Sequence, residues 1–172
     1  FIPVVVGLFA ISEMLTQSTL LDQVFKRVAL KAVKLPSLLD YKLTWKTILR
    51  SSGIGSFIGV LPAEGGTVAS LIGYSEAKRW SKKPEEFGKG SIEGIAGAEA
   101  ANNAATGGAM VPTLALGIPG SATTAVILTG LIIHGVRPGP DLFREQPEFL
   151  YGIFGSMLIA NIMFFVLGFF GA

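Results

Sequence analysis

The sequence of 172 residues has no cysteine and a single histidine, and its long apolar stretches carry almost no charge. Without cysteine the protein has no disulfide, no catalytic thiol and no cysteine-ligated metal. No serine has a matching His and Asp set, no Gly-rich loop ends in Gly-Lys-Ser/Thr, and no cluster of ligands has metal spacing. The sequence therefore does not support an enzyme or a bound cofactor.

The composition is that of a membrane protein. Half of the residues are hydrophobic, 22 are glycine, and the mean hydropathy is +0.57, which lies well outside the average of soluble proteins. Seven of the 14 basic residues fall between Lys26 and Arg50, and five more fall between Lys78 and Lys89. Because excess Lys and Arg mark the cytoplasmic side, we expect both basic stretches on that side.

The chain divides into apolar segments separated by polar ones. It begins without methionine in an apolar run, so we expect it to be part of a longer polypeptide. We predict an all-α integral membrane protein, a multi-span helical bundle with broken helices and a re-entrant hairpin. The expected segments of this single membrane-embedded unit are 1–21 (end of a span), 22–50 (basic connector), 51–74 (broken or re-entrant segment), 75–91 (polar loop), 92–135 (broken helices), 136–148 (loop) and 149–172 (span).

The segment 51–74 is interrupted in its middle by Pro62-Ala-Glu-Gly-Gly66. Basic residues flank it on both sides, which favours a hairpin that enters and leaves by the same face. Each leg of about 11 residues reaches about 16 Å, close to half of the hydrocarbon core, so the tip would lie near the midplane. The alternative is one full span with a kink at Pro62.

A second interruption lies inside the long apolar run 92–135, which is punctuated at Gly107-Gly108, Pro112 and Pro119-Gly120. We read this run as several helical pieces, two of them half-helices. A helix that restarts after Pro119-Gly120 would direct unpaired N–H groups and its positive dipole end at the break, which suits an anion. The candidate binding residues are Asn102, Asn103, Thr106, Gly120, Ser121, Thr123 and Thr124, together with Gly65, Gly66 and Thr67 at the first break.

Two acidic residues, Glu64 and Glu99, lie in segments predicted to be inside the membrane. A carboxylate is costly there, and such residues mark coupling-ion or proton sites by default. A structural carboxylate that snorkels or is hydrogen-bonded by neighbouring backbone is the alternative, and both readings stay open for these two residues.

The two interruptions resemble each other. When Leu61–Gly73 is aligned with Ile118–Gly130, proline, threonine, leucine and glycine match at four positions. Paired interrupted segments are the best sequence indication of a transporter site, although membrane helices rich in small residues also resemble each other by composition.

Five motifs carry a resemblance to a known family. They are Gly59-Val-Leu-Pro-Ala-Glu-Gly-Gly-Thr, Phe87-Gly-Lys-Gly-Ser-Ile-Glu-Gly, Ala98-Glu-Ala-Ala-Asn-Asn-Ala-Ala-Thr-Gly-Gly, Leu116-Gly-Ile-Pro-Gly-Ser and His134-Gly-Val-Arg-Pro-Gly-Pro140. In this order they resemble the large membrane subunit of tripartite tricarboxylate transporters, the TctA family, from about Ile48 to Phe143. The resemblance implies that the chain covers the second of two related halves. The usual Pro-Gly-x-Gly of the family is here Pro62-Ala63-Glu64-Gly65.

The expected function is that of a membrane subunit of a secondary transporter, which takes up a small carboxylate in symport with Na⁺ or H⁺. The resemblance implies a small membrane subunit and a periplasmic solute-binding protein as partners, and a multi-pass location in the bacterial inner membrane. The lipid bilayer is a further partner, and no nucleic acid is expected. A coupling Na⁺ is the one bound ion considered. A channel-like pore, a structural membrane subunit and a membrane-embedded enzyme are the alternatives.

Overall fold

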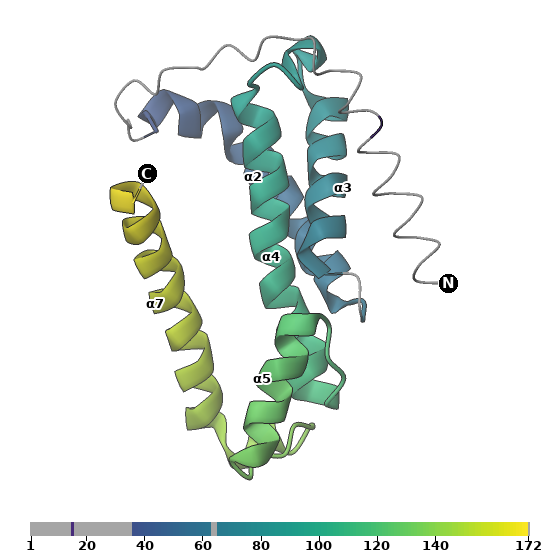
Figure 1. Cartoon of the computed structure of the whole chain (residues 1–172), viewed down its shortest axis with the longest axis vertical. Coiled ribbons are helices and arrows are strands. Elements are labelled where there is room, and N and C mark those ends of the chain that lie inside the picture. The colour runs from purple at the N-terminus through teal and green to yellow at the C-terminus, as the bar shows by residue number, and fades with distance from the viewer. Residues whose placement is uncertain (1–14, 16–35, 63–64, 172) are drawn as a thin grey trace. The chain divides into compact units, whose positions relative to one another are not determined.

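The computed structural model describes Leu15, residues 36–62 and residues 65–171, and all regular structure among them is helical (Figure 1). This confirms the predicted all-α class. Apart from Leu15, the expected span end at 1–21 lies outside the described residues, as do residues 22–35 of the connector 22–50. The elements are α2 (Leu38–Val60), α3 (Gly65–Trp80), the 3₁₀ turn η1 (Pro84–Glu86), α4 (Ile92–Leu116), α5 (Ala122–Ile133), α6 (Leu142–Glu145) and α7 (Pro147–Gly171).

Helices α2 and α3 form the two legs on either side of the first interruption, which begins at Leu61. Both legs are longer than predicted, since α2 takes in residues 38–50 of the expected connector and α3 continues to Trp80. The start of α2 has a local cause: the Asp40 N–H donates to the Ser37 hydroxyl and the Ser37 N–H donates to the Asp40 carboxylate, at 3.2 and 2.8 Å. Such a capping box starts a helix regardless of the basic residues that follow.

Helix α4 is the central element, and both α2 and α3 pack extensively on it (Figure 1). The contact is made through small residues. A Cβ added to Gly55 would collide with the backbone of Ala101, and one added to Gly59 would collide with the backbone of Ala105. Gly55 and Gly59 thus serve close helix approach, the role that small residues four positions apart commonly have in membrane helices.

Helix α4 runs without interruption from Ile92 to Leu116, so the predicted breaks at Gly107-Gly108 and Pro112 are wrong. Gly108 is a contact residue, because an added Cβ would collide with the Ser56 carbonyl of α2. Pro112 has no N–H, which removes one helical hydrogen bond. The next residue makes a local bond of its own, since the Thr113 hydroxyl donates to the Ala109 carbonyl at 2.7 Å.

The second predicted interruption, after Pro119-Gly120, is present. Helix α4 ends at Gly117, whose φ of +68° is the left-handed conformation that glycine adopts readily. The chain then folds back onto α4: Gly120 packs against Ala109, and its N–H donates to the Thr113 hydroxyl at 3.3 Å. Helix α5 starts two residues later.

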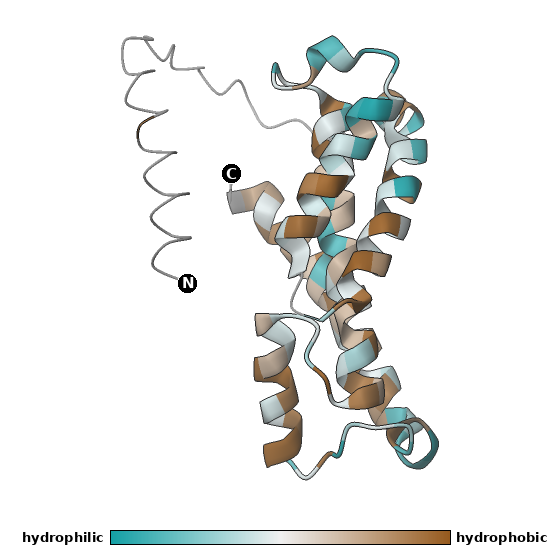
Figure 2. Cartoon of the chain, turned by 90° about the vertical axis from the view of Figure 1, so that its right-hand side faces the viewer, coloured by the Kyte–Doolittle hydropathy of each residue, from teal (hydrophilic) through white to brown (hydrophobic). Residues whose placement is uncertain are grey.

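The final part of the chain also differs from prediction. The expected loop 136–148 contains the short helix α6, and α7 begins at Pro147 because proline is favoured in the first helical turn. Within the described residues, Pro147–Phe170 is the one helix long and apolar enough to cross a membrane, and α5 is a shorter apolar helix. Figure 2 shows α7 as largely hydrophobic and the connection between α3 and α4 as hydrophilic.

Candidate functional site

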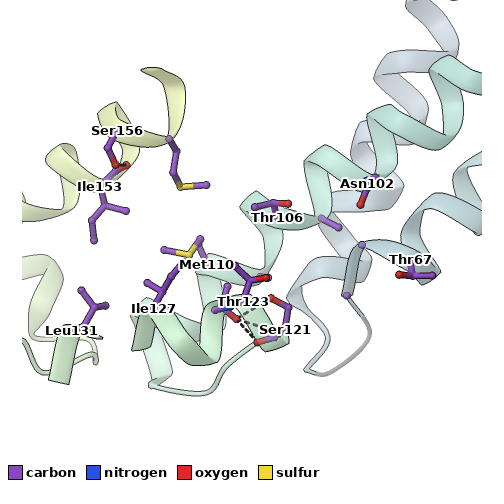
Figure 3. Close-up of a pocket in the computed structure, with 16 residues that line it drawn as sticks. Thr67, Asn102, Thr106, Met110, Ser121, Thr123, Ile127, Leu131, Ile153 and Ser156 are labelled. Carbon is purple, nitrogen blue, oxygen red and sulfur yellow. Dashed lines mark hydrogen bonds between the residues drawn. The ribbon is translucent and has the colours of Figure 1, made fainter. Parts of the chain in front are cut away.

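A cavity of about 510 Å³ lies where the two interruptions meet, with walls from α3, α4, α5 and α7 (Figure 3). The candidate binding residues come together here, except for Asn103 and Gly120. The predicted binding residues that line the cavity are Gly65, Gly66, Thr67, Asn102, Thr106, Ser121, Thr123 and Thr124. They come from three separate helices, so the tertiary fold assembles the cluster.

The start of α5 forms one wall. The Thr124 N–H donates to the Ser121 hydroxyl at 3.2 Å, and the Ser121 N–H donates to the Thr124 hydroxyl at 2.8 Å. These two bonds satisfy the first and last N–H groups of the turn. Among the described residues, the N–H groups of Ala122 and Thr123 have no acceptor. The positive end of the α5 dipole is therefore available at the cavity.

The start of α3 forms the opposite wall. Its first residues, Gly65 and Gly66, have N–H groups that lack a carbonyl partner within the helix. Gly66 also touches α4, since a Cβ added there would collide with Oδ1 of Asn102. Glycine at this position thus allows the Asn102 amide to lie directly against the end of α3. Two helix N-termini and one carboxamide consequently share one cavity.

The rest of the wall is largely apolar and was not predicted. Figure 3 shows Ile127 and Leu131 of α5 and Ile153 of α7 away from the polar side chains of Asn102 and Thr67. Helix α7 also contributes Ser156 and Met157, while α4 contributes Met110. Ile153, Ser156 and Met157 are three and four positions apart and therefore lie on one face of α7. Because α7 is apolar along its length, its sequence does not indicate that this particular face lines a cavity. The cavity is therefore polar on one side and apolar on the other.

Two predicted binding residues lie elsewhere. Asn103 is exposed on α4, and its amide donates to the Glu99 carbonyl one turn earlier, at 3.0 Å. Gly120 is buried against Ala109, so its lack of a side chain serves the packing of the interruption on α4. Neither residue lines the cavity.

Three acidic residues, Glu64, Glu99 and Glu93, lie in or near the predicted membrane segments. Glu64 lies outside the described residues. Glu99 is exposed on α4 and does not line the cavity. Glu93 is held structurally, since its carboxylate accepts hydrogen bonds from the hydroxyls of Thr47 at 2.7 Å and Ser81 at 2.6 Å.

The described residues that line the cavity include no charged side chain. The polar groups at the cavity are amides, hydroxyls and the ends of helix dipoles, and helix N-termini favour an anion. Among the described residues, no group of three His, Cys, Asp or Glu side chains is placed to hold a metal ion.

Interrupted helices around a cavity, together with an apolar helix of membrane-spanning length, fit a helical membrane protein. The model of the tripartite tricarboxylate transporter TctA family matches residues 1–172. The chain belongs to this family, which confirms the resemblance drawn from the five motifs.

Two relatives are similar to most of the chain, and both come from Agrobacterium vitis. An uncharacterized 52.8 kDa protein in the TAR-I ttuC' 3' region is 40% identical over 169 residues, which make up 97% of this chain and 33% of the relative. An uncharacterized protein in the TAR-II ttuC' 3' region is 47% identical over 113 residues, 66% of this chain and 47% of the relative. The chain thus spans a third to about half of the length of these relatives. No solved structure matches it.

Proposed function

We propose that the chain is part of the membrane subunit of a secondary active transporter, which takes up a small, tricarboxylate-like anion using a Na⁺ or H⁺ gradient. The proposal includes a small membrane subunit and a periplasmic solute-binding protein as partners, and a multi-pass location in the bacterial inner membrane. Membership of a tripartite transporter family supports it. The observation that carries it is the meeting of two helix N-termini with Asn102 and Thr106 at one cavity.

In this proposal a substrate carboxylate accepts hydrogen bonds from the free N–H groups at the start of α5 and from the Asn102 amide. The apolar wall lowers the local dielectric and strengthens each of these bonds. Neutral donors leave the affinity moderate, whereas a bidentate arginine would hold the anion tightly and slow its release in each cycle. A carrier that must both bind and release its substrate is well served by this chemistry.

The adjacent residues Asn102 and Asn103 allow a matched test of the site. Asn102→Ala removes a donor at the cavity, and we expect it to weaken substrate binding by about 1–3 kcal/mol, the usual loss for a hydrogen bond to a charged group. Asn103→Ala removes the same amide from a position of α4 that does not line the cavity, and it should leave affinity unchanged. Equilibrium binding of labelled citrate and other mono-, di- and tricarboxylates to the purified full-length complex measures both effects.

Equal affinity of the two variants and the parent for every carboxylate would remove the cavity as the substrate site. Equal weakening by both variants would point to a general effect of changing α4. Saturable uptake that depends on an ion gradient would distinguish a carrier from a channel-like pore.

We also propose Glu64 and Glu99 as coupling-ion sites. Charge neutralisation by Glu64→Gln or Glu99→Gln should remove or alter the dependence of uptake on Na⁺ or pH, because a cation site loses its compensating charge. Glu148→Gln, at the start of α7, is the control. Uptake in proteoliposomes with imposed gradients measures the effect, and ion dependence identical to that of the parent would give both residues a structural role.

The α2–α3 pair is proposed to be the re-entrant hairpin, with its tip near the midplane. Residues from both basic stretches, Lys46 of α2 and Lys82 after α3, line one cavity, which supports a common side for the two outer ends of the hairpin. Single cysteines at Ser37 and Ser81 should therefore be labelled by an impermeant thiol reagent from the cytoplasmic face. Labelling of the two positions from opposite faces would exclude a hairpin.

A further inference from the structure

A second cavity, of about 770 Å³, lies among the start of α2, the end of α3 and the start of α4. Its walls differ from those of the first cavity in being strongly basic. The basic residues that line it are Lys42, Lys46, Arg50, Lys82 and Lys83. We call it the basic cavity. None of these residues was singled out by the sequence as a binding residue.

The acidic residues of the basic cavity already have partners. Glu86 pairs with Lys83 at 2.8 Å, and this hydrogen bond raises the pKa of the Lys83 ammonium. The Glu93 carboxylate accepts from two hydroxyls, and the Asp40 carboxylate caps α2. Among the described residues, Lys42, Lys46 and Lys82 form no ion pair. Several positive charges of the cavity are therefore available to a ligand.

Arg50 is the most informative of these residues. Its guanidinium lies 4.9 Å from the centre of the Trp80 ring, a cation–π contact that holds the group beside the ring. Its Nη1 atom is buried and has no hydrogen-bond acceptor among the described residues. A buried donor without an acceptor is destabilising, and a charged one more so. An anion with paired oxygens would supply the acceptor in the bidentate geometry that guanidinium groups favour.

The rim of the basic cavity is apolar and exposed. Trp45, Trp80 and Ile92 line it and are 50%, 61% and 56% exposed. Tryptophan with lysine and arginine is the combination found where a membrane protein meets the polar headgroups of the bilayer. A ligand with a phosphate and apolar chains would satisfy both the basic interior and this rim.

We propose that the basic cavity binds a phosphate group, with Arg50 and Lys46 as its main ligands, and that an anionic phospholipid headgroup supplies it. The same chemistry would accept a soluble phosphate, which lacks acyl chains and would leave the rim uncovered. Basic pockets between helices at the cytoplasmic surface are suited to such headgroups. This site is separate from the cavity proposed for substrate.

The test uses the full-length protein in nanodiscs of phosphatidylcholine, with or without phosphatidylglycerol. Co-purified lipid, quantified by native mass spectrometry, should be enriched in phosphatidylglycerol around the parent protein. Arg50→Gln should lower the enrichment about tenfold, the usual effect of losing a charged hydrogen bond, and Lys46→Gln should lower it less. Lys78→Gln is the matched control, since this exposed lysine on α3 does not line the basic cavity.

Inorganic phosphate added to nanodiscs of phosphatidylcholine alone identifies the source of the phosphate group. Stabilisation by millimolar phosphate that is lost in Arg50→Gln would support the site and assign it to a soluble anion. Enrichment of phosphatidylglycerol without such stabilisation would assign it to lipid. If Arg50→Gln does not fold, Lys46→Gln decides alone. Equal lipid enrichment and equal phosphate response in the parent, Lys46→Gln and Lys78→Gln would overturn the proposal.

Discussion

The helices α2, α3 and α4 are held together by a different kind of contact from the one that holds α7. In the first group, glycine and alanine bring backbones together, as at Gly73, where an added Cβ would lie 2.5 Å from the Cβ of Ala101. Helix α7 instead packs through large side chains in its first half, with Leu150 buried in a cluster that includes Leu114. Backbone contact fixes helix spacing rigidly, whereas side-chain contact adjusts by changing rotamers.

The two kinds of helix contact also correspond to the two walls of the cavity. The polar wall belongs to α4 and to the starts of α3 and α5, next to the rigid backbone contacts. The apolar wall includes Ile153 and Met157 of α7, which are partly buried against the large-residue cluster. The polar part of the cavity is thus the part that is held most precisely.

The largest effect should come from filling a backbone contact. Gly59→Leu would force a side chain against the Ala105 backbone, which cannot move aside as a rotamer can. We expect a loss of more than about 3 kcal/mol in the free energy of unfolding, measured by denaturant titration of the full-length protein in micelles. Gly53→Leu is the control on the same helix, because nothing lies within 4 Å of a Cβ added there. Similar losses in both variants would mean that the contact with Ala105 is not the cause, since leucine favours a helix more than glycine does at either position.

A smaller effect is expected where side chains make the contact. Leu150→Ala removes a side chain that is 4% exposed and should cost about 2 kcal/mol, near the lower end for buried leucine, because neighbouring side chains can relax into the space. The same titration measures it.

The smallest effect should come from the second half of α7. Phe164 is 81% exposed in the described structure, so Phe164→Ala should change the free energy of unfolding by no more than about 0.5 kcal/mol in the isolated protein. A loss as large as that of Leu150→Ala would show that this half of α7 packs on another part of the full-length protein.

Sequence reasoning located the two interruptions because Pro-Gly and Pro-Ala-Glu-Gly-Gly stop helices locally. It failed at Gly107-Gly108 and Pro112, where the same residue types lie within α4. The effect of Gly108 depends on Ser56 of another helix, and no local pattern contains that information.

The candidate site shows the same limit of sequence reasoning. Polar residues inside an apolar run were recognisable, but Asn102 and Asn103 are chemically identical, and successive helical residues point about 100° apart. Which of them faces the cavity is decided by the position of the start of α3, where Gly66 touches Asn102. The apolar contribution of Ile153 had no signal at all, since it is one of many large apolar residues in α7.

The backbone contact between α2 and α4 has a consequence for biosynthesis. A ribosome delivers α2 and α3 first, yet α2 packs more extensively on α4 than on α3. Gly55 and Gly59 therefore lack their proper partner until residues as far as Ala105 have left the exit tunnel. During that interval α2 exposes a surface shaped for another helix, and only the delivery of α4 supplies the partner that this surface has in the folded structure.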